Sequence, residues 1–287
     1  MKFDWYYEPT SVNECVEILK EYGSEAKLLA GGTDLVVRLR SRAQKVKALV
    51  SLNAMPELSR IQKTEDGLHI GAMTKLMDIT KSEMFTGSWM VVKKSAGNVS
   101  SMQVRNVATI GGNTCNASPS ADTVPGMIAS DAIVRIAGTE GERALPLEQF
   151  FTGPGKTALK KDEMVVGFKL PDLGPGNGAA YKKYAIRGDS DIAIVGVAAR
   201  LKLSQDGIIE DARVVLGAVA PTPIRVPSAE QMLIGQVLTD ELAAKAAQAA
   251  SDFCTPITDA RATKEYRKEM VRVWTQYVLK EAHSNAQ

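Results

Sequence analysis

Two glycine pairs are the residues of this sequence best suited to chemistry with a phosphate group. Gly31-Gly32 follows the apolar start of "LLAGGTDLVVRLR", and Gly111-Gly112 stands in "TIGGNTCNASPSAD", a segment rich in small hydrogen-bonding side chains. Glycine allows close approach to the backbone, and the unpaired N–H groups at a helix N-terminus attract an anion. The first pair could also make only a tight turn, and the second segment could be an ordinary surface loop. Both pairs are therefore candidates for holding a phosphate.

Other kinds of site fit the residues less well. Cys15, Cys115 and Cys254 lie far apart without a C-x-x-C pair, so we expect three reduced thiols and neither an iron–sulfur cluster nor a structural zinc site. His69 and His283 leave little room for catalysis by a Ser-His-Asp or Cys-His arrangement. No metal site is predicted in this chain, and its chemistry is expected to come from a cofactor.

Two familiar nucleotide motifs can be rejected. "GPGKT" ends like a phosphate loop, but Phe150 stands where that motif requires a glycine. Neither glycine pair fits the G-x-G-x-x-G pattern of a Rossmann fold. The sequence therefore supports neither a nucleoside triphosphatase nor a Rossmann dehydrogenase.

Composition limits the class of protein. The 287 residues are 45% hydrophobic and 24% charged with a net charge of +2, which suits two packed domains and offers no basic surface for nucleic acid or an anionic membrane. No run of about 18 apolar residues occurs, and Asp4 and Glu8 interrupt the place where a signal peptide would need an apolar core. We expect a cytoplasmic protein.

The elements around the first glycine pair follow from local signals. Ser11 and Glu14 form a capping box before the helical pattern of "VNECVEILKEYG". "KLLA" then reads as a strand, the residues from about Thr33 to Arg42 as a helix, and "KALVSL" as a second strand. This β, loop, α, β order places the first glycine pair at a helix N-terminus.

The rest of the chain contains a further group of strands and helices. The second glycine segment is expected to be a loop between a helix at "VVKKSAGNVSS" and another that begins near Ser120. "MVVGFKL" reads as a strand, and "PDLGPGNG" marks a domain boundary or long turn. Strands are predicted at "YKKYAIR", "DIAIVGVAARLKL" and "ARVVLGAVA", followed by helices at "SAEQMLIG", "LTDELAAKAAQAASDFC" and "ATKEYRKEMVRVWTQYVLKEAHS". This order predicts a three-stranded antiparallel sheet covered by helices.

Several motifs together carry a family resemblance through nearly the whole chain. "KLLAGGTDL", "TIGGN", "ASPSAD", "TGPGK", "KYAIR" before "DIA", "APTPIR" and "RATKEYR" resemble the FAD-binding medium subunit of xanthine dehydrogenase and related molybdenum hydroxylases. The subunits of carbon monoxide dehydrogenase and of the aldehyde and nicotinate enzymes are similar. "TGPGK", "APTPIR" and "RATKEYR" resemble the bacterial xanthine dehydrogenase branch most.

The resemblance implies an α+β fold in two domains. A two-part FAD-binding domain of the vanillyl-alcohol-oxidase (PCMH) type is expected over 1–172, with subdomains of about 1–55 and 56–172. A C-terminal domain of the carbon monoxide dehydrogenase flavoprotein type, with the three-stranded antiparallel sheet and its helices, is expected over 179–287.

The resemblance also assigns a FAD site, in which the two glycine segments grip the pyrophosphate and ribityl chain. Close approach of the pyrophosphate would then explain both glycine pairs. Asp122 matches a residue near the nucleotide part of FAD, Val165 one on the adenine side, Lys183 a lysine beside the flavin ring, and Ile192 a residue packed against that ring. On their own, Lys183 and Ile192 would be read as a strand charge and a core aliphatic residue, and no catalytic residue is certain. The residues assigned to FAD are Lys27, Leu28, Leu29, Ala30, Gly31, Gly32, Thr33, Asp34, Thr109, Ile110, Gly111, Gly112, Asn113, Asp122, Val165 and Lys183.

The function implied by the resemblance requires partners. In this family a substrate is oxidised at a molybdopterin, electrons pass through two-iron clusters to FAD, and NAD usually accepts a hydride. Since this chain lacks cluster cysteines, a molybdenum-binding large subunit and an iron–sulfur small subunit are expected in a heterotrimer, and the expected complex is a xanthine dehydrogenase. Alternatives are the FAD subunit of an aldehyde, carbon monoxide or N-heterocycle dehydrogenase, a stand-alone FAD oxidase, and an assembly subunit without flavin.

Overall fold

The chain begins with a small parallel sheet that carries the first glycine pair. The computed structural model describes residues 3–41, 45–188 and 190–287. The first sheet has the order β1-β3-β2, and both of its strand pairs are parallel. The elements of this unit are β1 (Trp5–Tyr7), α1 (Val12–Tyr22), β2 (Ala26–Leu29), α2 (Leu35–Arg40) and β3 (Ala48–Ser51). The predicted β, loop, α, β order is confirmed, although the expected helix end near Arg42 lies outside the described residues.

Local capping decides where α1 begins. The Ser11 hydroxyl accepts a hydrogen bond from the Glu14 amide at 3.2 Å, as the capping box predicts. The Glu14 carboxylate accepts from the amide of Thr10 at 2.8 Å, one residue before the position that the box requires. The helix ends at Gly23, whose φ of +53° is rarely adopted by residues that carry a side chain.

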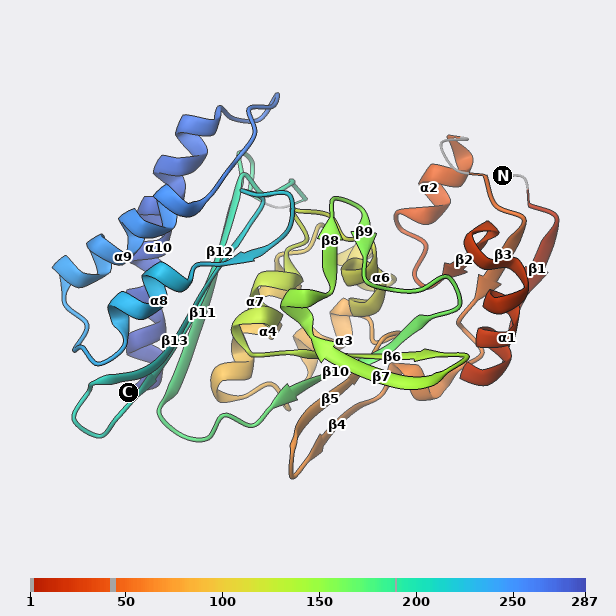
Figure 1. Cartoon of the computed structure of the whole chain (residues 1–287), viewed down its shortest axis with the longest axis horizontal. Coiled ribbons are helices and arrows are strands. Elements are labelled where there is room, and N and C mark those ends of the chain that lie inside the picture. The colour runs from red at the N-terminus through yellow and green to blue at the C-terminus, as the bar shows by residue number, and fades with distance from the viewer. Residues whose placement is uncertain (1–2, 42–44, 189) are drawn as a thin grey trace.

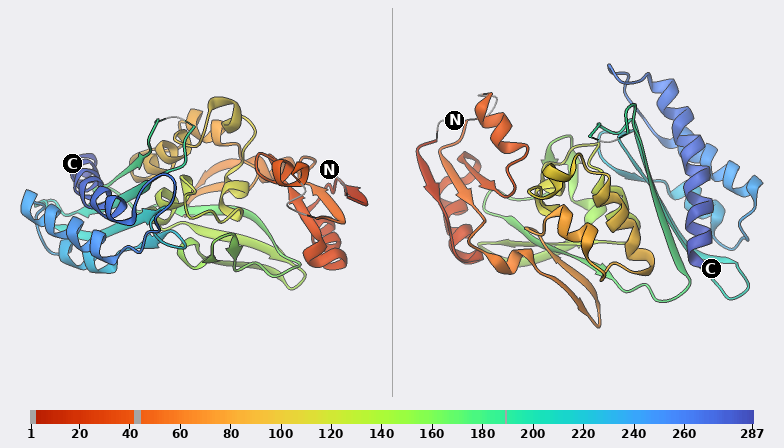
Figure 2. Two further views of the ribbon diagram at one scale, coloured as in Figure 1. Left: turned by 90° about the horizontal axis from the view of Figure 1, so that it is seen from above. Right: turned by 180° about the vertical axis from the view of Figure 1, so that it is seen from behind.

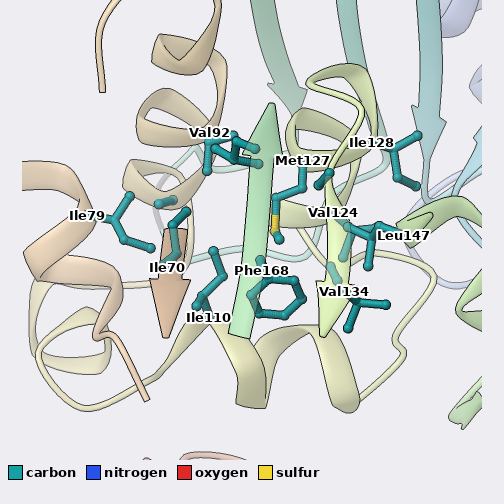
Figure 3. Close-up of a cluster of buried hydrophobic side chains, with 14 of the residues drawn as sticks. Ile70, Ile79, Val92, Ile110, Val124, Met127, Ile128, Val134, Leu147 and Phe168 are labelled. Atoms are coloured by element: carbon teal, nitrogen blue, oxygen red, sulfur yellow. The ribbon is translucent and has the colours of Figure 1, made fainter. Parts of the chain in front are cut away.

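The central unit is an antiparallel sheet packed against helices. Its order is β4-β5-β10-β6-β7. Figure 3 shows the core between this sheet and the helices, where Phe168 of β10 lies among Ile110, Met127 and Val134, all buried. The elements are β4 (Ile61–Thr64), β5 (Gly67–Gly71), α3 (Leu76–Lys81), α4 (Met90–Gly97), α5 (Met102–Arg105), α6 (Ile110–Cys115), α7 (Thr123–Ala129), β6 (Ile133–Gly138), β7 (Gly141–Pro146), β8 (Phe151–Gly153), β9 (Lys156–Thr157) and β10 (Met164–Pro171), with short 3₁₀ turns at Pro56–Ser59, Gly87–Trp89 and Leu147–Gln149. A further 3₁₀ turn, Gly23–Glu25, lies between α1 and β2 of the first unit.

The C-terminal unit is a second antiparallel sheet covered by helices, as the sequence predicts. Its order is β11-β12-β13-β14, so the two-residue β14 joins the three expected strands. Figures 1 and 2 show this unit at the opposite end of the molecule from the N-terminal sheet. Its elements are β11 (Asn177–Tyr184), β12 (Val195–Leu203), β13 (Ile209–Gly217), β14 (Ile224–Arg225), α8 (Pro227–Leu233), α9 (Asp240–Phe253) and α10 (Lys264–Ala286). The domain boundaries themselves stay a prediction.

A buried arginine joins the C-terminal sheet to the central unit. Arg200 of β12 is only 1% exposed, and its guanidinium donates to the Ala129 carbonyl at 3.0 Å and to Asn177 Oδ1 at 2.9 Å. Two carboxylates neutralise its charge, Asp131 at 2.8 Å and Asp211 at 2.7 Å. Because Ala129 and Asp131 belong to the central unit, these bonds fix the C-terminal sheet against it.

Candidate functional site

A cavity of about 540 Å³ lies between the two glycine segments. The first glycine pair lies between β2 and α2, and the second pair lies in the first turn of α6. The residues that the sequence assigned to one site are thus brought together from the N-terminal sheet and the central unit. Those that line the cavity are Lys27, Leu28, Ala30, Gly31, Gly32, Thr33, Asp34, Thr109, Gly112 and Asn113.

The first glycine of each pair is required by the protein itself. A Cβ atom on Gly31 would lie 2.1 Å from the carbonyl oxygen of Val107, and one on Gly111 would lie 2.6 Å from that of Ala72. Real Cβ atoms do not approach backbone so closely, so only glycine fits at these two positions. The interpretation that a ligand explains both pairs is therefore wrong for Gly31 and Gly111, where backbone from another segment makes the close approach.

The second glycine of each pair has a different role. Gly32 has a φ of +71°, a backbone conformation that residues with a side chain rarely adopt. The amide of Gly112 donates to Thr109 Oγ1 at 3.0 Å, which caps α6. The prediction of a loop throughout the second segment is wrong, because its first residues form this short helix. The two glycines hid the helix, whereas the threonine three residues before Gly112 was an available N-cap signal.

Polar side chains of both segments meet at the edge of the cavity. Nε of Arg38 lies 2.7 Å from Oδ2 of Asp34, and Nη2 of the same guanidinium donates to Oδ1 of Asn116 at 3.1 Å. Thr123 Oγ1 donates to Asn113 Oδ1 at 2.6 Å. Arg38 is not among the site residues predicted from the sequence, because nothing in its spacing indicates that α2 lies beside the end of α6.

The β8–β9 hairpin and the residues after it close another side of the cavity. Gly155, within the "TGPGK" motif, donates its amide to the Ala117 carbonyl at 2.9 Å and lines the cavity with Lys160 and Glu163. Arg143 binds both oxygens of the Glu163 carboxylate at 2.8 Å, which lowers the pKa of that carboxyl. The motif rejected as a phosphate loop is therefore part of the cavity wall.

A buried ion pair lies outside the lining of this cavity. Lys183 Nζ of β11 is 2.8 Å from Asp122 Oδ2, just before α7, and the two side chains are 4% and 9% exposed. Lys183 also donates to the Asn98 carbonyl at 3.0 Å, and the Tyr181 hydroxyl donates to Asp122 Oδ1 at 3.1 Å. Burial raises the pKa of the Asp122 carboxyl, while the ammonium and the hydroxyl act to lower it. Two predicted site residues from different units thus form one pair.

The other predicted residues are placed differently. Leu29, Ile110 and Gly111 do not line the cavity, and Ile110 and Val165 are buried in the central core. Ile192 is 47% exposed, and its amide donates to Asp191 Oδ1 at 2.9 Å. The cavity therefore gathers most of the two glycine segments but not Val165 or Ile192.

A second hollow of about 500 Å³ lies beside Lys183. It is bounded by α4, β11 and α10 and is rich in lysine. The Lys94 ammonium pairs with Glu281 at 2.8 Å, and the Lys182 ammonium lies 5.0 Å from the ring centre of Trp274. Four lysines line it, Lys93, Lys94, Lys182 and Lys183.

The described ranges 3–41, 45–188 and 190–287 offer neither a metal site nor a membrane-spanning helix. There, no group of histidine, cysteine and carboxylate side chains is arranged to hold a metal ion. Cys15, Cys115 and Cys254 are free thiols, as expected. In the same ranges, no helix combines the length and apolar character needed to cross a membrane.

Two family models together match most of the chain. The model described as the FAD binding domain in molybdopterin dehydrogenase matches residues 1–173. The model described as the CO dehydrogenase flavoprotein C-terminal domain matches residues 179–282.

Whole-chain similarity agrees with these matches. The chain is 33% identical over 282 residues to the xanthine dehydrogenase FAD-binding subunit of Escherichia coli O157:H7, covering 98% of this chain and 96% of the relative. It is 34% identical over 265 residues to the carbon monoxide dehydrogenase medium chain of Hydrogenophaga pseudoflava, covering 92% of each. The structure superposes with a TM-score of 0.95 and 33% identity on a chain of the H. pseudoflava carbon monoxide dehydrogenase that lacks the molybdenum-pyranopterin moiety, covering 99% of this chain and 98% of that one.

Proposed function

Because the chain belongs to the family of FAD-binding medium subunits of the xanthine and carbon monoxide dehydrogenases, we propose that the cavity between its glycine segments holds the pyrophosphate and ribityl chain of FAD. The residues to which we assign this binding are Lys27 to Asp34 and Thr109 to Asn113. The observation that carries the proposal is the meeting of these two segments at one cavity of about 540 Å³. We assign Asp122, Val165 and Lys183 to the same cofactor by their place in the family pattern.

The chemistry of the cavity suits a long anionic cofactor. Backbone at Gly32 and Gly112 carries no side chain that would obstruct a phosphate, and Lys27, Arg38 and Lys160 supply positive charge at the wall. Glycine at position 31 allows Val107 and Ala108, just before the second segment, to pack against the first segment. The chain's own residues therefore provide both the room and the charge that a dinucleotide needs.

FAD would supply a group that accepts electrons from metal clusters and gives them to a second acceptor as a hydride. The protein's part is to orient it and to fix the charge around it. The Asp122–Lys183 pair is buried and neutral as a unit, so it places an ammonium group beside the site without a large net charge. Its Tyr181 hydrogen bond holds the carboxylate in one orientation.

We propose NAD as the electron acceptor. Ile192 is half-exposed and leaves open surface where the family pattern places the flavin ring. Lysine side chains around the second hollow, among them Lys93 and Lys182, supply charge that would suit the phosphates of a nicotinamide nucleotide. Both features support hydride transfer to NAD at this end of the site.

We further propose that the complex is a xanthine dehydrogenase. The family model and the whole-chain similarity to a xanthine dehydrogenase subunit support assembly with other subunits of a molybdenum hydroxylase. We propose that these are a molybdenum-binding large subunit and an iron–sulfur small subunit, in a cytoplasmic heterotrimer. The cysteines of this chain, Cys15, Cys115 and Cys254, are free thiols that lie far apart in the sequence, and we therefore assign the iron–sulfur clusters to a partner. A related aldehyde, carbon monoxide or N-heterocycle dehydrogenase is the second candidate, favoured by the 34% identity to a carbon monoxide dehydrogenase medium chain.

Purification of the native complex tests the proposal. We expect molybdenum, iron and one FAD per copy of this chain, together with reduction of NAD when xanthine is added. Carbon monoxide and aromatic aldehydes serve as alternative substrates. Turnover of one of these but not of xanthine would select the second candidate. Reoxidation of the reduced complex by oxygen but not by NAD would refute NAD as the electron acceptor. A folded chain that binds no FAD would refute the whole proposal.

A further inference from the structure

Arg38 is a charged side chain of the cavity that is not among the residues assigned to FAD from the sequence. It stands on α2, one turn after Asp34, and its side chain is 50% exposed at the solvent edge of the cavity. Its Nε pairs with Asp34 at 2.7 Å, and its Nη2 donates to Asn116 at 3.1 Å. Asp34 lies on the first glycine segment and Asn116 lies on the second, so the guanidinium bridges the two segments.

These two bonds hold the arginine in place and leave part of it available. A guanidinium has five N–H groups in a rigid planar fork. The bonds to Asp34 and Asn116 use two of them, so three can donate to another partner. A guanidinium fixed in advance loses less side-chain entropy when it binds an anion, and its fork matches the oxygen atoms of a phosphate.

We propose that Arg38 is a phosphate-binding residue of the cavity, held in position by Asp34 and Asn116. The inference rests on the proposed function, since it takes the pyrophosphate of FAD as the anion. Lys27 and Lys160 also line the cavity, but Arg38 is the cation tied to both segments. Asn116 is then a positioning residue that acts through the arginine.

The proposal predicts how affinity responds to salt. Arg38→Gln should weaken FAD binding to the full-length chain about tenfold, which corresponds to about 1.4 kcal/mol, through faster dissociation. Since the contact is electrostatic and half-exposed, the ratio of the two dissociation constants should approach one as NaCl is raised from about 0.05 to about 0.5 M. Asn116→Ala should weaken binding by a smaller factor, about threefold, because it frees the arginine without removing its charge.

Titration of FAD into the flavin-free chain, followed by flavin fluorescence, measures these constants. Arg40→Gln is the matched control, since Arg40 lies on the same helix, is exposed and does not line the cavity. It should leave affinity unchanged, and circular dichroism should show all variants folded. An Arg38→Gln affinity equal to that of the control would overturn the proposal, as would a loss of affinity independent of salt. A wild-type chain that binds no FAD would refute the proposed function, whereas wild-type binding with no effect at Arg38 refutes this inference alone.

Discussion

Replacing Lys183 tests the buried ion pair that joins β11 to the residue before α7. In Lys183→Met the ammonium disappears, while the Asp122 carboxylate stays buried beside the Tyr181 hydroxyl. Removing one partner of a buried ion pair costs about 3–5 kcal/mol, because the remaining charge has lost its counter-charge and its water. The hydroxyl still donates to Asp122 at 3.1 Å, so we expect the lower end, a loss of about 3 kcal/mol in the free energy of unfolding at neutral pH.

The pH dependence identifies the cause of that loss. Burial already raises the pKa of the Asp122 carboxyl, and removal of the ammonium raises it further. A carboxyl with a higher pKa in the folded than in the unfolded state lowers stability as pH rises between the two values, because the folded state holds the proton more tightly. The deficit of Lys183→Met should therefore be small near pH ~4, the unfolded pKa of aspartate, and full at pH ~8.

Urea unfolding of the flavin-free chain, followed by tryptophan fluorescence and circular dichroism, measures both effects. Asp122→Asn in the Lys183→Met background removes the titrating group, so the double variant should regain most of the stability and lose the pH dependence. If the free energy of unfolding of Lys183→Met lies within about 0.5 kcal/mol of the wild-type value at pH ~8, the ion pair does not stabilise the fold as proposed. A double variant as unstable as the single variant would lead to the same conclusion. In the flavin-loaded chain, the two-electron potential of Lys183→Met should fall more at high pH, where Asp122 stays ionised.

Three further substitutions test the framework of the site. Gly31→Ala would place a methyl group 2.1 Å from the carbonyl oxygen of Val107, so we expect a loss of about 2 kcal/mol in stability and of FAD retention; a stable variant with stoichiometric flavin would contradict the contact. Arg200→Met leaves the Ala129 carbonyl and Asn177 Oδ1 without their buried donor, while Arg213 still pairs with both carboxylates, so we expect a loss of about 2 kcal/mol in the free energy of unfolding measured with urea; a loss below about 0.5 kcal/mol would show that this network does not join the two units. Arg143→Met removes the partner that lowers the pKa of Glu163, and the stability gained from this ion pair exists above the ordinary carboxyl pKa of 4.5 and disappears as pH falls, so the thermal midpoints of variant and wild type should differ at pH ~7 and converge below pH ~4. A difference in midpoint that persists in acid would show that the loss comes from packing of the Arg143 side chain instead.

Local signals in the sequence were enough to locate most of the secondary structure. Ser11 predicted the start of α1 because an N-cap hydroxyl bonds to an amide only three residues away. The β2, α2, β3 order and the three long C-terminal strands followed from hydrophobic periodicity, which also depends on near neighbours. The exception is α6, where two glycines with low helix propensity hid a helix that Thr109 caps.

The tertiary structure decided which distant residues meet. The Arg38–Asn116 bond joins residues 78 apart in the chain, and the Asp122–Lys183 pair joins residues 61 apart. The family pattern named Asp122 and Lys183 separately as site residues, but spacing along a chain constrains only contacts within one element or turn, so their partnership was not visible. The same reason explains Gly31, whose lack of a side chain is required by the backbone of Val107. The sequence alone thus determined the two glycine segments, whereas tertiary packing decided what the first glycine of each pair is for. Gly31 lies against Val107 where the N-terminal unit meets the central unit, and Gly111 lies against Ala72 within the central unit.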